Sequence, residues 1–114
     1  MRTNKYGNLK AGRYASKLEA RRAQELILLQ KSGKIRDLRQ QVAFIVIPKQ
    51  DRERAVRYIA DFTYRQTQDG QFVVEDVKSA PTKTPAYVLK RKLMLLVYGI
   101  RVREYYEQTV RATA

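Results

Sequence analysis

The chain has 114 residues and carries 24 lysines and arginines against 11 acidic residues, a formal net charge of +13. This length suffices for one domain with a modest core, and the charge indicates a polyanionic partner, with nucleic acid first and an anionic membrane surface second. The absence of cysteine and histidine from the sequence excludes disulfides, thiolate chemistry and the commonest general base. Any bound metal would therefore be held by oxygen, which favours Mg²⁺ or Mn²⁺.

Membrane insertion and secretion have no support in the sequence. The longest apolar run near the end, residues 93–98, is far too short to cross a bilayer. The N-terminus lacks the apolar core of a signal peptide. We therefore expect no membrane association and a cytoplasmic location.

The N-terminal third is predicted to be an arm followed by a helix. Residues 1–15 are polar and basic and contain two glycines, which is typical of a flexible arm. A helix is expected over residues 16–32. Ser16 and Glu19 match a Ser-x-x-Glu capping box, and Gly33 supplies the stop.

The rest of the chain is predicted to hold strands around a second helix. Strands are expected at residues 38–48, 56–65 and 72–78, with Asp69-Gly70 as a hairpin turn, and a short last strand at residues 100–104. The second helix begins at Thr84 or Pro85, reaches Tyr98 and ends at Gly99. The order αβββαβ predicts one α/β domain over residues 16–104, with a mixed sheet flanked by helices, a right-handed crossover into the last strand and a frayed tail at 105–114.

Two acids interrupt stretches that otherwise have the pattern of buried strands. Asp61 lies in the run Tyr58-Ile59-Ala60-Asp61-Phe62, and Asp76 lies in Val74-Glu75-Asp76-Val77-Lys78. Buried carboxylates are costly unless they are compensated, and a cation is the usual compensation. Residues 61–90 hold four basic and four acidic residues within an otherwise basic chain, which fits a metal site; the alternative is a chance distribution of charge.

The relation between the two acids depends on the strand register. Asp76 and Lys78 share one face of their strand, and an ordinary surface ion pair is the simpler interpretation of that step. Antiparallel pairing across the Asp69-Gly70 turn brings cross-strand side chains to about 5 Å, so Asp61 and Asp76 could share a cation. A slip of one residue would bring Glu75 beside Asp61 instead.

Two further residues have two interpretations each. Glu19 falls in the middle of the apolar arc of the first helix, whereas Glu25 lies at its edge, so Glu19 is either a cap or a site residue facing the sheet. Lys90 on the second helix either extends to solvent or meets a phosphate near the site.

These residues in this order resemble the PD-(D/E)XK nuclease superfamily, which has the restriction-endonuclease-like fold, and within it a family of small phage and prophage proteins of unknown function. The resemblance covers residues 5–104 and is carried by residues 5–8, 16–20, 33–35 with Gln41, 58–62, 74–78 and 87–103. Ala60 replaces the proline that usually precedes the first aspartate, and Asp76 stands where the motif allows Asp or Glu.

The resemblance implies a role for each matching residue. Glu19, Asp61, Asp76 and Lys78 would be catalytic, and Mg²⁺, with Mn²⁺ as a substitute, would be held by Asp61, Asp76, the backbone carbonyl of Val77 and Glu19. The resemblance thereby favours Asp76 over Glu75 as the ligand. Contacts to nucleic acid are expected from Arg13, Lys17, Gln41, Arg54, Arg57 and Lys90.

The function expected from the resemblance is metal-dependent cleavage of DNA. No recognition module is visible, so structure-selective cutting of branched DNA, such as a Holliday junction, in phage recombination or DNA processing is favoured over site-specific restriction. A homodimer and partners among phage replication or recombination proteins are expected. The alternatives are a non-catalytic basic DNA-binding protein and a nuclease subunit of a phage complex, and the choice between DNA and RNA stays open.

Overall fold

The computed structural model describes residues 16–106, so the predicted arm at 1–15 and most of the predicted tail lie outside the described residues. The elements are, in order, α1 (Lys17–Lys31), β1 (Ile35–Ile47), β2 (Val56–Gln66), β3 (Phe72–Val77), the 3-10 helix η3 (Ala80–Thr82), α2 (Pro85–Tyr98) and β4 (Arg103–Tyr105). The sheet order is β1-β2-β3-β4, with the first three strands antiparallel and β4 parallel to β3. The predicted α/β class, with a mixed sheet, is confirmed.

Both helices begin and end where local sequence signals predicted. The Ser16 hydroxyl accepts a hydrogen bond from the Glu19 backbone N–H at 3.1 Å, and the Thr84 hydroxyl accepts one from Tyr87 N–H at 3.2 Å. Gly33 and Gly99 follow the helices with φ values of 83° and 70°, a left-handed conformation that glycine adopts without steric cost.

The strand limits differ from prediction at both ends of the sheet. β1 begins at Ile35, three residues before the predicted start, and β4 covers Arg103–Tyr105 instead of 100–104. Val102 is buried in the core beside α2, so the chain joins the ladder only after this anchor. Tyr105 was expected to begin the frayed tail, but it pairs with Val77 as the last residue of β4.

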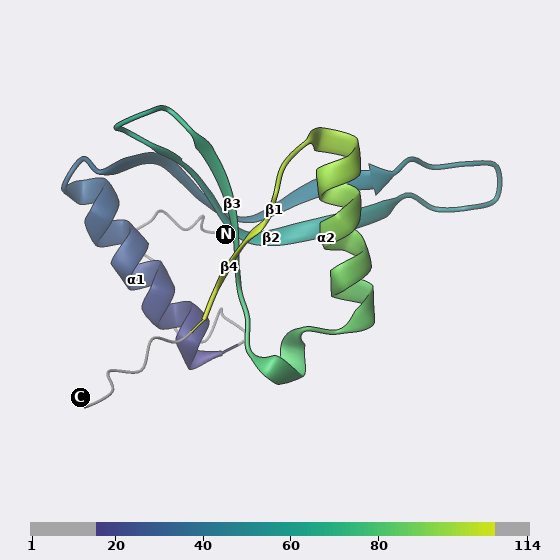
Figure 1. The fold of residues 1–114 in the computed structure, drawn as a ribbon, viewed down its shortest axis with the longest axis horizontal. Helices are drawn as coiled ribbons and strands as arrows, with labels where there is room; N and C mark the ends of the chain where they lie inside the picture. The colour runs from purple at the N-terminus through teal and green to yellow at the C-terminus, as the bar shows by residue number, and fades with distance from the viewer. Residues whose placement is uncertain (1–15, 107–114) are drawn as a thin grey trace, which may run out of the picture.

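Two apolar cores lie on the sheet, one under each helix. Leu26 and Ile27 of α1 pack with Phe62 and Tyr64, whereas Tyr87 and Met94 of α2 pack with Tyr58, Ala60 and Val74. Figure 1 shows α1 and α2 on opposite sides of β3 and β4. Residues two apart on a strand normally share one face, so β2 must rotate about its axis between Ala60 and Phe62. Asp61 lies at that rotation.

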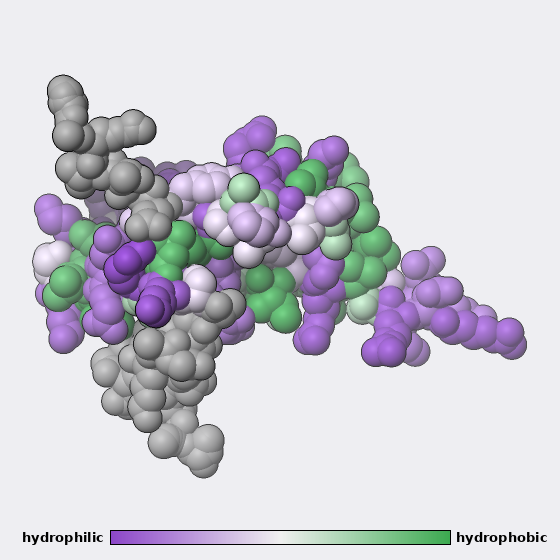
Figure 2. All heavy atoms as spheres, turned by 90° about the horizontal axis from the view of Figure 1, so that it is seen from below, coloured by the Kyte–Doolittle hydropathy of each residue, from purple (hydrophilic) through white to green (hydrophobic). Residues whose placement is uncertain are grey.

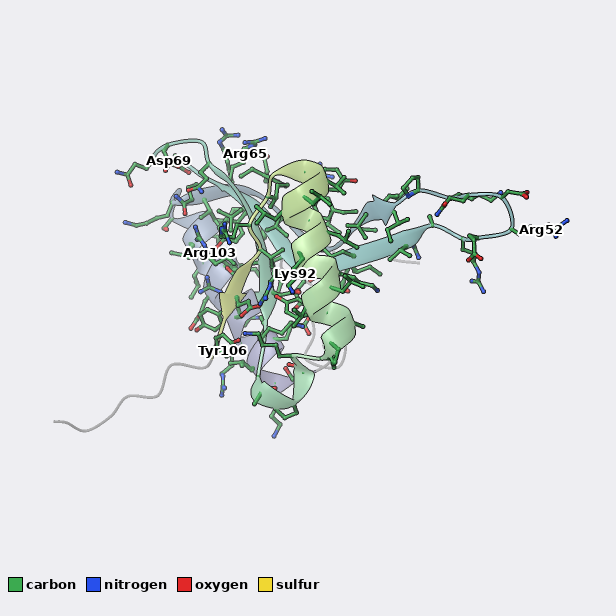
Figure 3. All side chains as sticks on the ribbon, turned by 45° about the vertical axis from the view of Figure 1, so that its right-hand side comes forward. Arg52, Arg65, Asp69, Lys92, Arg103 and Tyr106 are labelled. Atoms are coloured by element: carbon green, nitrogen blue, oxygen red, sulfur yellow. The ribbon has the colours of Figure 1, made fainter. Side chains whose placement is uncertain are left out.

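The β1–β2 hairpin projects well beyond the rest of the molecule (Figure 1), and Arg52 lies at its tip (Figure 3). Neither helix within residues 16–106 is long and apolar enough to span a membrane.

Candidate active site at the splayed ends of β2 and β3

Asp61 and Asp76 meet where β2 and β3 separate. The last backbone pair between these strands joins Phe62 to Glu75. Beyond it, the Asp61 backbone N–H donates to Asp76 Oδ1 at 3.0 Å, and the Val77 N–H donates to Asp61 Oδ2 at 2.9 Å. Each carboxylate therefore replaces a backbone acceptor of the other strand, and the exchange holds the two acids side by side.

Asp76 is buried in a setting that disfavours its charge. Only 3% of the residue is exposed, and Tyr58 Oη donates to Asp76 Oδ2 at 2.6 Å. Burial and the charge of Asp61 raise the pKa of Asp76 to about 7, although hydrogen bonds from Tyr58 and Asp61 act in the opposite direction. A cation between the two carboxylates would relieve their mutual repulsion and stabilise the charged form of Asp76.

Lys78 supplies the nearest positive charge. Its Nζ lies 3.8 Å from Asp76 Oδ2 and 4.0 Å from the centre of the Tyr87 ring. The side chain is only 13% exposed, so the ammonium group is held between a carboxylate and an aromatic face.

Tyr87 is itself fixed from β4. Its Oη donates to Glu104 Oε2 at 2.7 Å, and Arg91 Nη1 donates to the same oxygen at 2.7 Å. Burial alone would raise the pKa of Glu104, but hydrogen bonds from Tyr87 and Arg91 lower it to about 2. Glu104 therefore stays charged and anchors the ring on which Lys78 rests.

Glu75 points to the other side of the sheet. Arg22 of α1 donates from Nε to Glu75 Oε2 at 2.6 Å and from Nη2 to Oε1 at 3.0 Å, and Tyr64 Oη donates to Oε1 at 2.7 Å. Burial and the charge of Glu75 raise the pKa of Tyr64 to about 12. The register left open by the sequence therefore places Asp76, and not Glu75, beside Asp61.

Glu19 approaches the pair from α1. The residue is 4% exposed, and Gln41 Nε2 donates to Glu19 Oε2 at 3.2 Å. Gln41 has a φ of 55°, a left-handed conformation that costs a non-glycine residue on the order of 1–3 kcal/mol and is concentrated at functional sites. The Glu19 backbone N–H donates to the Ser16 hydroxyl at the cap of α1, while its side chain accepts a hydrogen bond from Gln41 of β1.

Two cavities share three lining residues, Asp61, Lys78 and Thr82. The first, of about 340 Å³, is also lined by Asp76, Arg57 and Lys90. The second, of about 320 Å³, is also lined by Glu19 and Val77. Asp61 thus lies between a cavity with cationic side chains and a cavity that contains Glu19, and Asp76 lines the first of them.

Residues 3–110 match the family described as "Protein of unknown function (DUF1064)". The chain belongs to this family. No curated protein and no solved structure matches the chain.

In this DUF1064 chain, the donors available to a metal are the two carboxylates. Among residues 16–106, no group of three or more acidic side chains lies close enough to hold an ion alone. The pair fits a hard divalent cation that keeps several waters, as Mg²⁺ does, because its donors are oxygens and the one ammonium group of Lys78 balances only one of the two carboxylates.

Two predicted contact residues lie away from the two cavities, and a third is outside the described residues. Lys17 is exposed at the first position of α1, and Arg54 is exposed in the β1–β2 loop; neither lines the two cavities. Arg13 lies outside the described residues. Gln41 reaches the site through Glu19, and Arg57 and Lys90 line the first cavity.

The sequence reasoning missed Tyr58, Tyr87 and Arg22. Arg22 falls inside the apolar arc of α1, between Leu29 and Leu26 on the helical wheel, and a charge there indicates a buried partner. The two tyrosines carried no such signal, because each acts through a hydroxyl or ring contact with a residue distant in sequence.

Proposed function

We propose that the chain is a Mg²⁺-dependent DNA endonuclease of the PD-(D/E)XK type. The observation that carries the proposal is the meeting of Asp61 and Asp76 at the splayed strands, with the Lys78 ammonium group beside them. A divalent cation would polarise the phosphate and lower the pKa of a bound water. Asp61, Asp76 and the Val77 carbonyl would hold it, and Glu19 would bind it through a water molecule or help to hold a second ion.

The residues around the acids have separate tasks. Lys78 orients the attacking water or stabilises charge that develops on the phosphate, and Tyr87 fixes the position of its ammonium group. Arg57 and Lys90 bind the phosphates that flank the scissile bond, because they line the cavity that contains both acids.

The substrate class follows from charge and shape. The net charge of +13 and the projecting hairpin with Arg52 at its tip suit a contact along the DNA backbone, which carries no sequence information. Cleavage selected by structure, at junctions or flaps made during phage recombination in the bacterial cytoplasm, is the activity we propose.

The test is cleavage of labelled four-way junction, flap, duplex, single-stranded DNA and RNA in Mg²⁺, Mn²⁺ or EDTA. We expect metal-dependent nicking of branched DNA, lost in Asp76→Asn and Lys78→Met with circular dichroism unchanged. Asp51→Asn is the matched control, because Asp51 is an exposed acid in the β1–β2 turn. Wild-type activity in both site variants would reject the assignment.

Two alternatives give different results in the same assay. A non-catalytic DNA-binding protein is favoured by the ion pair of Lys78 with Asp76, which would then be structural. It predicts binding of DNA without cleavage in either metal. A nuclease subunit of a phage complex predicts activity only after a co-encoded protein is added.

We also propose that the active form is a homodimer, because cutting both strands of a junction requires two sites. α2 is apolar on most sides, yet Leu89 and Leu96 on its outer face are 57% and 79% exposed. Figure 2 shows hydrophobic surface beside the projecting hydrophilic loop. A second copy of the chain on this face would cover the exposed side of α2, so that the helix is buried on both sides. A standard interface buries roughly 800 Å² of surface on each partner.

Sedimentation velocity tests the dimer. Leu96→Glu is expected to give a monomer without unfolding, because the side chain is already mostly exposed. Leu28→Glu is the control and should leave the dimer intact, because Leu28 is also mostly exposed, at 64%, but lies on α1. A wild-type monomer at high concentration would rule the interface out.

A further inference from the structure

A third cavity, of about 380 Å³, lies at the other end of the sheet, near the β2–β3 turn. Its walls combine apolar side chains with two arginines, one acid and a threonine: Val42, Phe44, Phe72, Arg39, Arg65, Asp37 and Thr63. The acid, Asp37, is already paired with Arg36, whose Nη1 lies 3.0 Å from Asp37 Oδ2. The volume falls in the range of about 300–1,000 Å³ that is typical of small-molecule sites. The proposed active site uses none of these residues.

Thr63 indicates that the cavity is built to receive a polar group. The residue is only 2% exposed. Its hydroxyl has no hydrogen-bond partner within the part of the chain that the structure describes. Buried polar groups are normally paired, so an unpaired hydroxyl that lines a cavity points to a bound group that completes it.

Arg65 and Phe72 form a prepared stacking platform. The Arg65 guanidinium lies 5.1 Å from the centre of the Phe72 ring, and Arg65 Nη1 donates to the Gly70 carbonyl at 2.9 Å. Figure 3 shows Arg65 at the end of the sheet beside Asp69. Neither Arg65 nor Arg39 forms an ion pair with an acid among residues 16–106, so both charges are available to a ligand.

We propose that this cavity binds one unpaired nucleotide of a nucleic-acid strand, with its base on Arg65 and Phe72. Apolar side chains, a buried hydroxyl and two arginines outside the described ion pairs match a base with an attached phosphate, whereas a phosphate alone would not use the apolar side chains. Phe72, Val74 and Asp76 alternate along β3, so the cavity lies on the same face as the candidate active site, about 13 Å along the strand.

The inference rests on the proposed nucleic-acid substrate but not on cleavage, so it is tested in EDTA. Fluorescence anisotropy is measured with a labelled 12-nucleotide thymidine oligomer and with a blunt duplex of equal length. Arg65→Gln and Phe72→Ala are each expected to weaken single-strand binding about tenfold and to leave duplex binding within twofold. Arg101→Gln, an exposed arginine that lines a different cavity, is the control for charge loss.

Thr63 provides a test that separates recognition from folding. Thr63→Val replaces the hydroxyl with a methyl group of similar size and is expected to weaken single-strand binding several-fold. Thr63→Ser keeps the hydroxyl and is expected to bind the single strand as the wild type does. Equal single-strand affinity in wild type, Phe72→Ala and Thr63→Val would overturn the inference even if the protein cleaves DNA. Equal losses of affinity for the single strand and the duplex would also overturn the inference. Losses of single-strand affinity alone, in a protein that cleaves no DNA, would support the nucleotide site but not the proposed nuclease activity.

Discussion

Arg22 and Glu75 form a two-bond ion pair through the α1 side of the sheet, with donor–acceptor distances of 2.6 and 3.0 Å. Glu75 precedes Asp76 directly in β3, so the orientation of one fixes the orientation of the other. The pair therefore locks the register that places Asp76 beside Asp61. A structural contact on one face of the sheet thus arranges the acids on the opposite face.

Removal of Arg22 should destabilise the protein strongly. Arg22→Ala leaves the fully buried Glu75 carboxylate without its cation, and breaking a buried pair in this way costs roughly 3–5 kcal/mol. Urea denaturation measures the free energy of unfolding. Glu25→Gln is the control, since the Glu25 side chain is 52% exposed and the variant should change stability by less than about 1 kcal/mol. If Arg22→Ala lowers the free energy of unfolding by less than about 1 kcal/mol, the ion pair with Glu75 does not hold the strand register.

Without metal, stability should fall as the pH rises from about 4 to 7. The pKa of Asp76 is raised to about 7 in the folded protein by burial and by Asp61, against about 4 in an unfolded chain. The folded state therefore binds the Asp76 proton more tightly than the unfolded chain does. The resulting contribution to the free energy of unfolding is fully present below pH 4 and is lost as the pH rises through 7. The expected loss is on the order of a few kcal/mol.

The comparison of wild type with Asp76→Asn isolates this effect. Urea denaturation in EDTA at a series of pH values from 4 to 8 should show a difference between the two proteins that changes through this window and is constant above it. The Asn variant cannot titrate at this position, so its curve reports all the other groups. Parallel curves would show that Asp76 titrates normally in the folded state.

The limits of prediction from sequence follow from the range of each interaction. Ser16, Gly33, Thr84 and Gly99 act within one helical turn, and the helix ends they predict are correct. The β4 strand was placed too early because its start depends on burial of Val102 under α2 rather than on a local signal.

The same reasoning explains what could be foreseen at the site. The alternation of side chains along β3 left Glu75 and Asp76 as candidates for the acid beside Asp61. Arg22, 53 residues away in the sequence, decides between them because it binds Glu75 on the other face of the sheet. The twist that turns β2 over at Asp61 leaves no mark in its residue pattern. Tyr58 and Tyr87 were therefore indistinguishable from ordinary core aromatics until the packing was known.

Divalent metal should stabilise the wild-type protein independently of any activity. A ligand that binds only the folded state at ten times its dissociation constant adds about 1.4 kcal/mol to the free energy of unfolding. We expect the melting temperature to rise with Mn²⁺ or Mg²⁺ at pH 8, where Asp76 is ionised. Asp61→Asn and Asp76→Asn should each abolish the rise, and Asp51→Asn should retain it. An equal rise in all four proteins would locate the metal elsewhere.

Tyr87 should control cleavage through Lys78. Tyr87→Leu removes the ring that lies 4.0 Å from Lys78 Nζ, and loss of a desolvated cation–π contact of about 1–2 kcal/mol predicts a cleavage rate roughly 5- to 30-fold lower. Tyr87→Phe keeps the ring and loses only the bond to Glu104, so a smaller decrease is expected. Single-turnover cleavage of a four-way junction at saturating protein and Mg²⁺ measures both rates. Only Tyr87→Leu frees the Lys78 ammonium group to move away from Asp76. Equal rates in the two variants would show that the ring has only a packing role.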